Sequence, residues 1–339
     1  MGQFTSSPTG AVAKSNGKLR TIHHLSWPRT ASRPSVNDGI DPVNVTLSYT
    51  TLEPLFNSIR ASHAATIPTC LWKADLADAF RHCVVSTHDV GLLRFTFESQ
   101  RFVDTRLPFG CRSSPFLFNL YAEAFYWILE SNGIPLSHYL DGFFGCSANP
   151  LEALAAFNSL ASHLGISVQA RKLESGTKLE ILGILIDSAN GMASIAPERR
   201  VKLLALLNNT LSRDTASALE LLAIAGHLVS VCRICPPGRA FLRRIYDASH
   251  DLHIPSRRRI PHSAKLDLRW WRDVLRDWDG IRLILPDRPR VELWTDASTT
   301  VGFGGHLGPQ DRPTAAWCTV IPARLKNRDI MTLLRCLNP

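Results

Sequence analysis

Two acidic residues constrain the fold of this 339-residue chain more than any other feature, because each lies at the end of a short apolar segment. Asp75 closes residues 69–75, which predict a buried strand, and Asp141 lies within residues 138–146, which predict a hairpin. A carboxylate at the end of a buried strand is costly unless a cation compensates its charge, and a divalent metal ion is well suited to do so. The sequence therefore favours two neighbouring strands whose carboxylates converge on a metal site.

Two converging carboxylates of this kind have a defined chemistry. Two divalent ions ~3.5–4 Å apart activate an attacking hydroxyl and neutralise the leaving group in phosphoryl transfer. Asp75 and Asp141 are the candidates to hold such ions. The alternative interpretation is that each acid caps a turn or pairs with a nearby arginine, which is the commoner role of an isolated aspartate.

The first half of the chain alternates between predicted strands and predicted helices. The helices are expected at residues 52–63, 116–131 and 152–164, and the strands at 69–75, 90–97, 101–107 and 179–186. Together with the hairpin at 138–146, this order predicts an α+β fold.

The second half is mainly helical up to a final hairpin. Pro197 suits the first position of a helix, and Ser217 with Glu220 has the spacing of a capping box. An apolar face around Trp270 and Trp271 predicts a further helix that packs into the core. Residues 291–307 predict a β-hairpin.

The basic charge of the chain is concentrated in its second half. The whole chain has 38 Lys and Arg against 29 Asp and Glu, a net charge of +9. Residues 197–290 hold 18 of the basic and 10 of the acidic residues, an excess of eight. We therefore expect a surface for a polyanion such as nucleic acid in the second half, and an acidic catalytic centre in the first.

Targeting and membrane signals are weak. The N-terminus lacks the charged-then-apolar pattern of a signal peptide. The most apolar run, residues 216–232, contains Glu220 and His227 and is shorter than the ~20 apolar residues that cross a bilayer. We expect an intracellular protein, in the nucleus or the cytoplasm, without a membrane partner.

Three short patterns that suggest other chemistry have a plainer interpretation. Cys232 and Cys235 form a lone CxxC without a second pair, so a zinc or redox role is a minority interpretation. His23 and His24 lack a third ligand at metal-binding spacing. The glycines of residues 302–305 do not open a helix as a dinucleotide-binding motif does.

Five segments match one family in order and spacing. Residues 75–81 (DLADAFR) resemble the first catalytic motif of reverse transcriptases. Residues 107–119 (LPFGCRSSPFLFN) resemble their primer and template motif, PFGxxSxPxxFN, and residues 139–142 (YLDG) resemble their YxDD box. Residues 171–174 (RKLE) and 182–184 (LGI) lie where the family has its lysine motif and its LG primer grip. The resemblance implies an α+β polymerase right hand with fingers, palm and thumb.

Other segments resemble retrotransposon enzymes, particularly the tyrosine-recombinase elements of the DIRS type. These segments are residues 7–8, 17–20, 35–40, 236–242 and 270–271, while 294–298 with 302–305 resemble the first strand pair of a ribonuclease H domain. The resemblance implies fingers at residues 1–67 and 84–107, a palm at 68–190, a thumb at 191–250, a connection at 251–290 and a truncated ribonuclease H-like segment at 291–339.

The resemblance also assigns a metal site and a general acid. Asp75 and Asp141 would bind Mg²⁺ or Mn²⁺, with the carbonyl of Leu76 as an additional ligand. Lys172 would protonate the departing pyrophosphate. The plainer interpretation of Lys172 is a solvated surface charge.

The nucleotide-binding residues are likewise carried over from the family. Phe80 would stack under the incoming sugar and leave no room for a 2′-hydroxyl, and Arg20 and Lys18 would meet the triphosphate. Phe109 and Gly110, from the motif at residues 107–119, would also bind the nucleotide. Alternatively, Phe80 is ordinary core and Arg20 a solvated charge.

One position departs from the family pattern. Reverse transcriptases carry two acids in the YxDD box, whereas Asp141 is followed here by Gly142. If Gly142 replaces only an auxiliary ligand, we expect activity lower by roughly 10- to 100-fold, and if both metals depend on the lost acid, activity vanishes.

The ribonuclease H resemblance is incomplete as well. Asp296 matches the first acid of that fold, but residues 326–339 contain Asp329 and no Glu where the family has a catalytic glutamate. We therefore predict no ribonuclease H activity from this chain.

The sequence thus predicts an RNA-directed DNA polymerase of a retrotransposon, impaired by Gly142. Its partners would be an RNA or DNA template-primer and dNTPs. The alternative is a catalytically inert nucleic-acid-binding remnant with a polymerase fold. The excess of basic residues supports nucleic-acid binding under both hypotheses and does not separate them.

Overall fold

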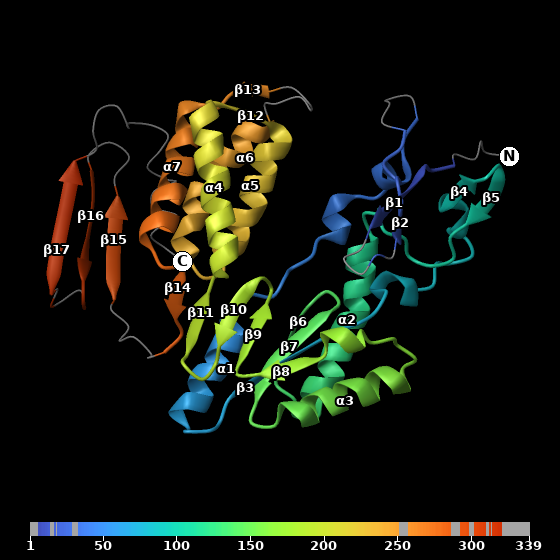
Figure 1. Cartoon of the computed structure of the whole chain (residues 1–339), viewed down its shortest axis with the longest axis horizontal. Helices are drawn as coiled ribbons and strands as arrows, with labels where there is room; N and C mark the ends of the chain where they lie inside the picture. The colour runs from blue at the N-terminus through green and yellow to red at the C-terminus, as the bar shows by residue number, and fades with distance from the viewer. Residues whose placement is uncertain are drawn as a thin grey trace. The chain divides into compact units, whose positions relative to one another are not determined.

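The computed structural model describes most of the chain in two compact units, residues 1–179 and 180–339. The described residues are 6–13, 17, 19–28, 33–250, 257–285, 292–297, 302–309, 312 and 314–320. Figure 1 shows the helices and strands of both units.

A four-stranded antiparallel sheet forms the centre of the first unit, with the order β6-β7-β3-β8. Its strands are β3 (Cys70–Asp75), β6 (Ser137–Tyr139), β7 (Gly142–Ser147) and β8 (Glu174–Gly176). The predicted strand at 69–75 and the hairpin at 138–146 are confirmed. Strand β3 lies between two neighbours in this sheet, and its apolar residues Leu71, Trp72 and Ala74 are fully buried.

Helices cover both faces of this sheet (Figure 1). They are α1 (Glu53–Ala64), α2 (Ser114–Ser131) and α3 (Pro150–His163), close to the predicted ranges. Phe143 of β7 belongs to one buried cluster with Phe125 of α2 and Phe157 of α3. The side chain of Cys146, on the opposite face of β7, accepts a hydrogen bond from Ser58 of α1. The sheet is therefore held rigidly between helices.

One hairpin precedes β3 in the sequence and another follows it. They are β1 (Thr9–Ala13) with β2 (Leu19–His23), and β4 (Arg94–Phe97) with β5 (Gln100–Val103). The predicted strands at 90–97 and 101–107 are too long, because Val90–Leu92 is a 3₁₀ turn and the chain leaves β5 at Asp104, whose side chain is buried. The polar turn predicted between them is present, with Glu98 and Ser99 in the left-handed region.

A small sheet opens the second unit, with the order β14-β11-β10-β9. Its strands are β9 (Lys178–Ile181), β10 (Ile184–Asp187), β11 (Met192–Ser194) and β14 (Ile281–Leu283). The single strand predicted at 179–186 is wrong, because Leu182 and Gly183 both adopt positive φ, 50° and 78°, and turn the chain back on itself. A Cβ on Gly183 would lie 2.5 Å from the Arg199 guanidinium.

Four helices make up most of the rest of this unit. They are α4 (Pro197–Arg213), α5 (Ala218–Val231), α6 (Arg243–His250) and α7 (His262–Asp277). Helix α4 begins at Pro197 and the capping box of Ser217 and Glu220 opens α5, both as predicted. In the core, the fully buried Asp267 of α7 accepts a hydrogen bond from Arg244 Nε at 3.0 Å.

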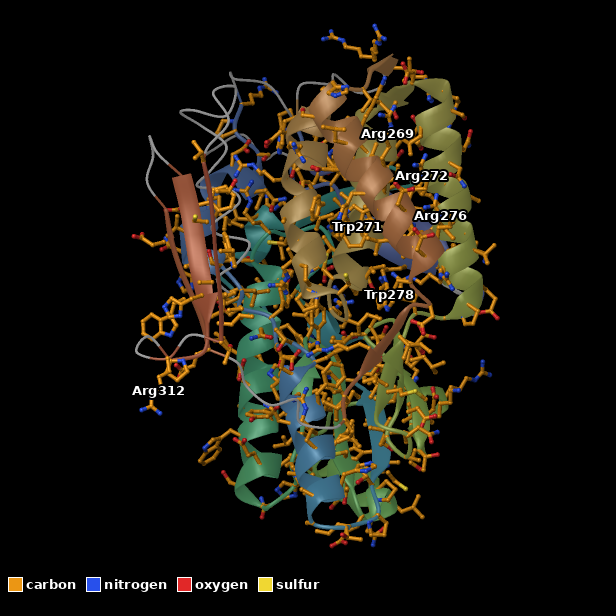
Figure 2. All side chains as sticks on the ribbon, turned by 90° about the vertical axis from the view of Figure 1, so that its left-hand side faces the viewer. Arg269, Trp271, Arg272, Arg276, Trp278 and Arg312 are labelled. Carbon is orange, nitrogen blue, oxygen red and sulfur yellow. The ribbon has the colours of Figure 1, made fainter. Side chains whose placement is uncertain are left out.

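Helix α7 has a buried apolar side and a charged side. Trp271 and Leu275 are fully buried, as the sequence predicts for this helix. Figure 2 shows Arg269, Arg272 and Arg276 one after another along α7. Arg272 and Arg276 form ion pairs with Asp273, so part of the basic charge on this helix is balanced locally.

A three-stranded antiparallel sheet, β15-β16-β17, follows. Its strands are β15 (Leu293–Ala297), β16 (Gly302–Leu307) and β17 (Ala315–Val320), which confirms the predicted hairpin at 291–307. Across the described part of the chain, every helix is too short or too polar to cross a membrane.

Candidate active site

The two acids identified from the sequence meet at one end of the central sheet. Strand β3 ends at Asp75, and β7 begins at Gly142, which pairs directly with Asp75. The backbone N–H of Leu76 donates a hydrogen bond to the Asp141 carbonyl at 2.9 Å. Asp75 and Asp141, far apart in the sequence, are thereby fixed beside each other by strand pairing.

The surroundings of Asp141 disfavour its charged form. Burial is the main cause that raises the pKa of Asp141 above its usual value, and the nearby Asp75 carboxylate raises it further. The positive charges of Lys172 and Arg20 act in the opposite direction. Two carboxylates and two basic side chains therefore share one electrostatic environment, and additional positive charge there would favour ionised Asp141.

Lys172 lies directly against the first acid. Its Nζ forms an ion pair with Asp75 Oδ2, and the Lys172 side chain is 53% exposed. Backbone hydrogen bonds hold the segment before it against β3, because Gln169 N donates to the Asp75 carbonyl at 2.9 Å and Ala77 N donates to the Ser167 carbonyl at 2.7 Å. The structure thus brings the predicted lysine to the predicted metal ligand.

These residues fit a divalent metal ion whose remaining ligands come from a substrate. Mg²⁺ is commonly held by one or two carboxylates and by substrate phosphates, which matches Asp75 and Asp141. The half-buried, charge-disfavoured Asp141 is the kind of carboxylate that a cation would stabilise. In the described ranges no cluster of three or more His, Cys, Asp or Glu forms a metal cage.

Two of the predicted nucleotide-binding residues, Arg20 and Phe109, line a cleft of about 370 Å³. The Arg20 guanidinium lies 4.5 Å from the centre of the Phe109 ring. The Phe109 ring also contacts Phe80, with the two ring centres 4.8 Å apart. Gly110 has a φ of +107°, and a Cβ there would lie 1.9 Å from the His23 carbonyl, so only glycine fits. Lys18 lies outside the described residues.

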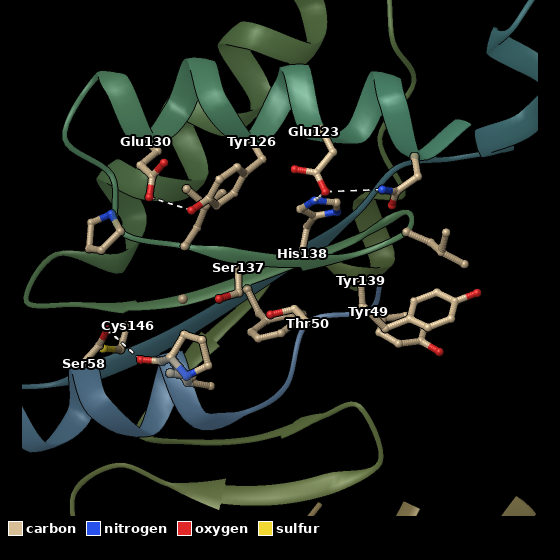
Figure 3. Close-up of a pocket in the computed structure, with 18 of the residues that line it drawn as sticks. Tyr49, Thr50, Ser58, Glu123, Tyr126, Glu130, Ser137, His138, Tyr139 and Cys146 are labelled. Atoms are coloured by element: carbon tan, nitrogen blue, oxygen red, sulfur yellow. Dashed lines mark hydrogen bonds and ion pairs between the residues drawn. The ribbon is translucent and has the colours of Figure 1, made fainter. Parts of the chain in front are cut away.

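A pocket of about 520 Å³ behind the YLDG hairpin was not predicted from the sequence (Figure 3). Tyr49 stacks on Tyr139 with ring centres 4.7 Å apart. His138 Nε2 lies 3.3 Å from Glu123 Oε1. Tyr49 and Glu123 come from segments without a recognisable motif, so only the tertiary structure reveals that they support the hairpin that carries Asp141.

The predicted ribonuclease H acid lies on the exposed β15. Asp296 pairs through its backbone with Gly304 of β16. It belongs to no cluster of metal-ligating side chains among the described residues.

The raised pKa of Asp141 leads to a stability prediction. Since its folded-state pKa lies above the unfolded value, its contribution to stability is present at low pH and is lost as pH rises through the folded pKa. We expect Asp141→Asn to raise the melting temperature of the metal-free protein at neutral pH, because the amide carries no charge to desolvate. Thermal unfolding in EDTA across pH 4–8 measures this. A variant that is less stable than the parent at every pH would contradict it.

The chain has a mixed α and β polymerase fold, with two neighbouring acids at one end of its central sheet. The family model described as reverse transcriptase (RNA-dependent DNA polymerase) matches residues 13–186, just over half of the chain. The chain belongs to the reverse transcriptase family.

Solved structures of foamy viral protease-reverse transcriptase share the fold. The complex of the dRH form with double-stranded DNA has a TM-score of 0.61 at 19% identity and covers 99% of this chain and 55% of that one. The complex with an RNA/DNA hybrid gives 0.59 at 18%, with 98% and 42% covered, and a further double-stranded DNA complex gives 0.61 at 19%, with 99% and 66% covered. This chain thus spans about half the length of these proteins. A search of curated proteins finds no match.

Proposed function

We propose that the chain is an RNA-directed DNA polymerase that extends a primer with dNTPs and that it comes from a retrotransposon of the DIRS-like, tyrosine-recombinase type. The observation that carries the polymerase proposal is the pairing of Asp75 with Gly142, which places Asp141 beside Asp75 at the end of the sheet. Gly142 is expected to reduce the activity.

Asp75, Asp141 and the Leu76 carbonyl would hold Mg²⁺ or Mn²⁺. When bound, the metal supplies activation of the primer hydroxyl and neutralises charge on the leaving pyrophosphate. Reverse transcriptases typically use divalent metals, in keeping with this assignment. Asp75 and Asp141 would orient the reacting groups. The strand pairing of Asp75 with Gly142 holds the two acids in place, so that they need not rearrange during the reaction.

Lys172 has a role that follows from its position. It balances the charge of Asp75 in the absence of substrate. When Asp75 acts as a ligand, the lysine ammonium is free to donate a proton to the pyrophosphate oxygen. The exposure of its side chain leaves it room for this movement.

Arg20, Phe80 and Phe109 would form the nucleotide site. Arg20 reaches the triphosphate from β2, together with Lys18, and Phe109 with Gly110 forms the facing wall. Phe80 packs between Phe109 and Phe118, with ring centres 4.8 and 5.7 Å away, so its ring has a fixed position under the sugar.

Sugar selection provides a test of this assignment. We expect Phe80→Val to raise incorporation of ribonucleotides relative to deoxyribonucleotides by about tenfold or more, because the smaller side chain leaves space for a 2′-hydroxyl. Single-nucleotide addition with matched dNTP and rNTP measures the ratio, and Phe80→Tyr, which keeps the ring, is the control. An unchanged ratio in Phe80→Val would remove Phe80 from the sugar site.

The template-primer would be RNA or DNA. The foamy viral proteins with this fold were solved with double-stranded DNA and with an RNA/DNA hybrid. The excess of basic residues at 197–290 supports a nucleic-acid surface in the second unit.

The proposed domains are fingers at residues 1–67 and 84–107, a palm at 68–190, a thumb at 191–250, a connection at 251–290 and a ribonuclease H-like segment at 291–339. The proposed location is intracellular.

A second candidate function is an inert nucleic-acid-binding remnant, favoured by the missing acid at Gly142. Primer extension by the purified parent chain separates the two, since the polymerase proposal requires synthesis that depends on a divalent metal and on Asp75. The proposed ribonuclease H-like segment is expected to lack activity, and cleavage of the RNA strand of a hybrid would contradict that.

A further inference from the structure

A buried carboxylate outside the metal site connects three parts of the first unit. The Asp104 side chain is 8% exposed. Arg81 NH1 donates to its Oδ2 at 2.6 Å, the backbone N–H of Arg106 donates to its Oδ1 at 3.1 Å, and His23 Nε2 lies 3.3 Å from Oδ2. Oδ2 therefore meets side chains from two separate segments, while Oδ1 accepts a backbone hydrogen bond from its own loop.

Each of these segments also carries a residue of the proposed nucleotide site. His23 closes β2, which holds Arg20. Arg81 belongs to the 3₁₀ turn Ala79–His82, which holds Phe80. Asp104 begins the loop that leads to Phe109 and Gly110. One carboxylate thus links the elements that carry Arg20, Phe80 and Phe109: Arg20 and Phe109 line the cleft, and Phe80 packs against Phe109.

Close backbone contacts couple β2 to the loop that runs from Asp104 to Gly110. His23 N donates to the Phe109 carbonyl at 2.8 Å. Gly110 lies beneath the His23 carbonyl, where no side chain fits. A shift of His23 would therefore move the Phe109 backbone and, through β2, the Arg20 side chain that rests on the Phe109 ring.

The carboxylate is held in its charged form. Burial acts to raise the pKa of Asp104, but the hydrogen bonds from His23, Arg81 and the Arg106 backbone outweigh it and hold the pKa well below its usual range. The network consequently persists at neutral pH as an anion surrounded by donors.

We propose that Asp104 is a positioning residue for the nucleotide site, which through His23 and Arg81 fixes Arg20, Phe80 and Phe109 in the geometry that binds the incoming nucleotide. This inference rests on the proposed function. It adds to that function a residue that belongs to none of the motifs and does not line the metal site. A truncated or neutral residue at this position loosens all three elements at once.

Asp104→Asn tests the proposal because it keeps the shape and removes the charge, and His23→Gln is a second variant that keeps a donor. The matched control is Asp267→Asn, a fully buried carboxylate with an arginine partner in the second unit. The first readout is the amide exchange rate of His23, which needs no activity. The second readout is the dNTP concentration at which half of the protein–template-primer complex survives a challenge with heparin, measured in the presence of Mg²⁺.

We expect Asp104→Asn to speed exchange at His23 and to raise the half-protecting dNTP concentration, each about tenfold, with template-primer affinity unchanged. His23→Gln should restore most of the affinity that His23→Leu loses. Asp267→Asn should lower thermal stability without either effect. Unchanged exchange at His23, or an equal loss of template-primer and dNTP binding, would overturn the proposal. Failure of the parent to bind dNTP, with exchange altered as expected, would refute the polymerase function and leave the positioning network standing.

Discussion

Asp75→Asn is expected to abolish primer extension, with the rate of single-nucleotide addition falling on the order of 10³-fold or more. The amide has the shape of the carboxylate but cannot neutralise a divalent cation. Asp75 is also the residue that strand pairing fixes beside Asp141 and that Lys172 contacts. Removing the charge of Asp75 therefore disrupts the metal site and also removes the ion-pair partner of Lys172.

The control for this variant is Glu174→Gln, on the neighbouring strand β8. Glu174 Oε1 lies 3.0 Å from Lys73 Nζ on the same sheet, in an ion pair in which Glu174 is exposed and Lys73 is partly exposed. Its loss is expected to change the rate by less than about threefold, because exposed pairs contribute little. Template-primer binding, measured in the same preparations, should be the same in both variants. Residual synthesis by Asp75→Asn at a tenth of the parent rate would show that the acid is not a metal ligand.

Gly142→Asp is expected to raise the rate of nucleotide addition by roughly 10- to 100-fold. A Cβ at this position would lie 3.5 Å from Asp75 Oδ1 and 3.6 Å from the Tyr139 carbonyl, which are ordinary contacts, and the backbone is not in the left-handed region. A carboxylate therefore fits next to Asp75 without strain and adds a third acid to the site.

Gly142→Ala is the matched control, because it fills the same space without a charge. Gly142→Asn adds the shape and hydrogen-bonding capacity without the anion. Rate enhancement confined to the aspartate variant supports a missing metal ligand, whereas equal enhancement by alanine would assign the effect to backbone order. Synthesis by Gly142→Asp alone, with none by the parent, would support the inert-remnant hypothesis for the natural chain.

Local sequence patterns predicted the parts of the site that depend on strand and helix periodicity. The strand that ends at Asp75 and the hairpin that contains Asp141 were both found, since buried strands and tight turns leave clear local signals. The convergence of the two acids also followed from those elements. The exact ends of the strands at 90–107 and the turn at Leu182 did not, because positive φ at a leucine has no sequence signature.

The charge network was beyond sequence reasoning for a different reason. Asp104, His23 and Arg81 come from three distant segments, and the local sequence around any one of them does not indicate the other two. Their burial and pairing depend on how β2, the 3₁₀ turn and the loop pack together. The stacking of Tyr49 on Tyr139 is a tertiary contact of the same kind. Functional support of this sort becomes visible only in the folded chain.

Binding of Mn²⁺, followed by electron paramagnetic resonance, tests most directly whether Asp75 and Asp141 share a metal site. The parent should bind Mn²⁺, with competition by Mg²⁺, and Asp75→Asn and Asp141→Asn should each weaken binding by at least about tenfold. The double variant should lose little more than either single variant, because both residues serve the same site. Unchanged binding in both single variants, or fully additive losses, would contradict a shared metal site and with it the polymerase account.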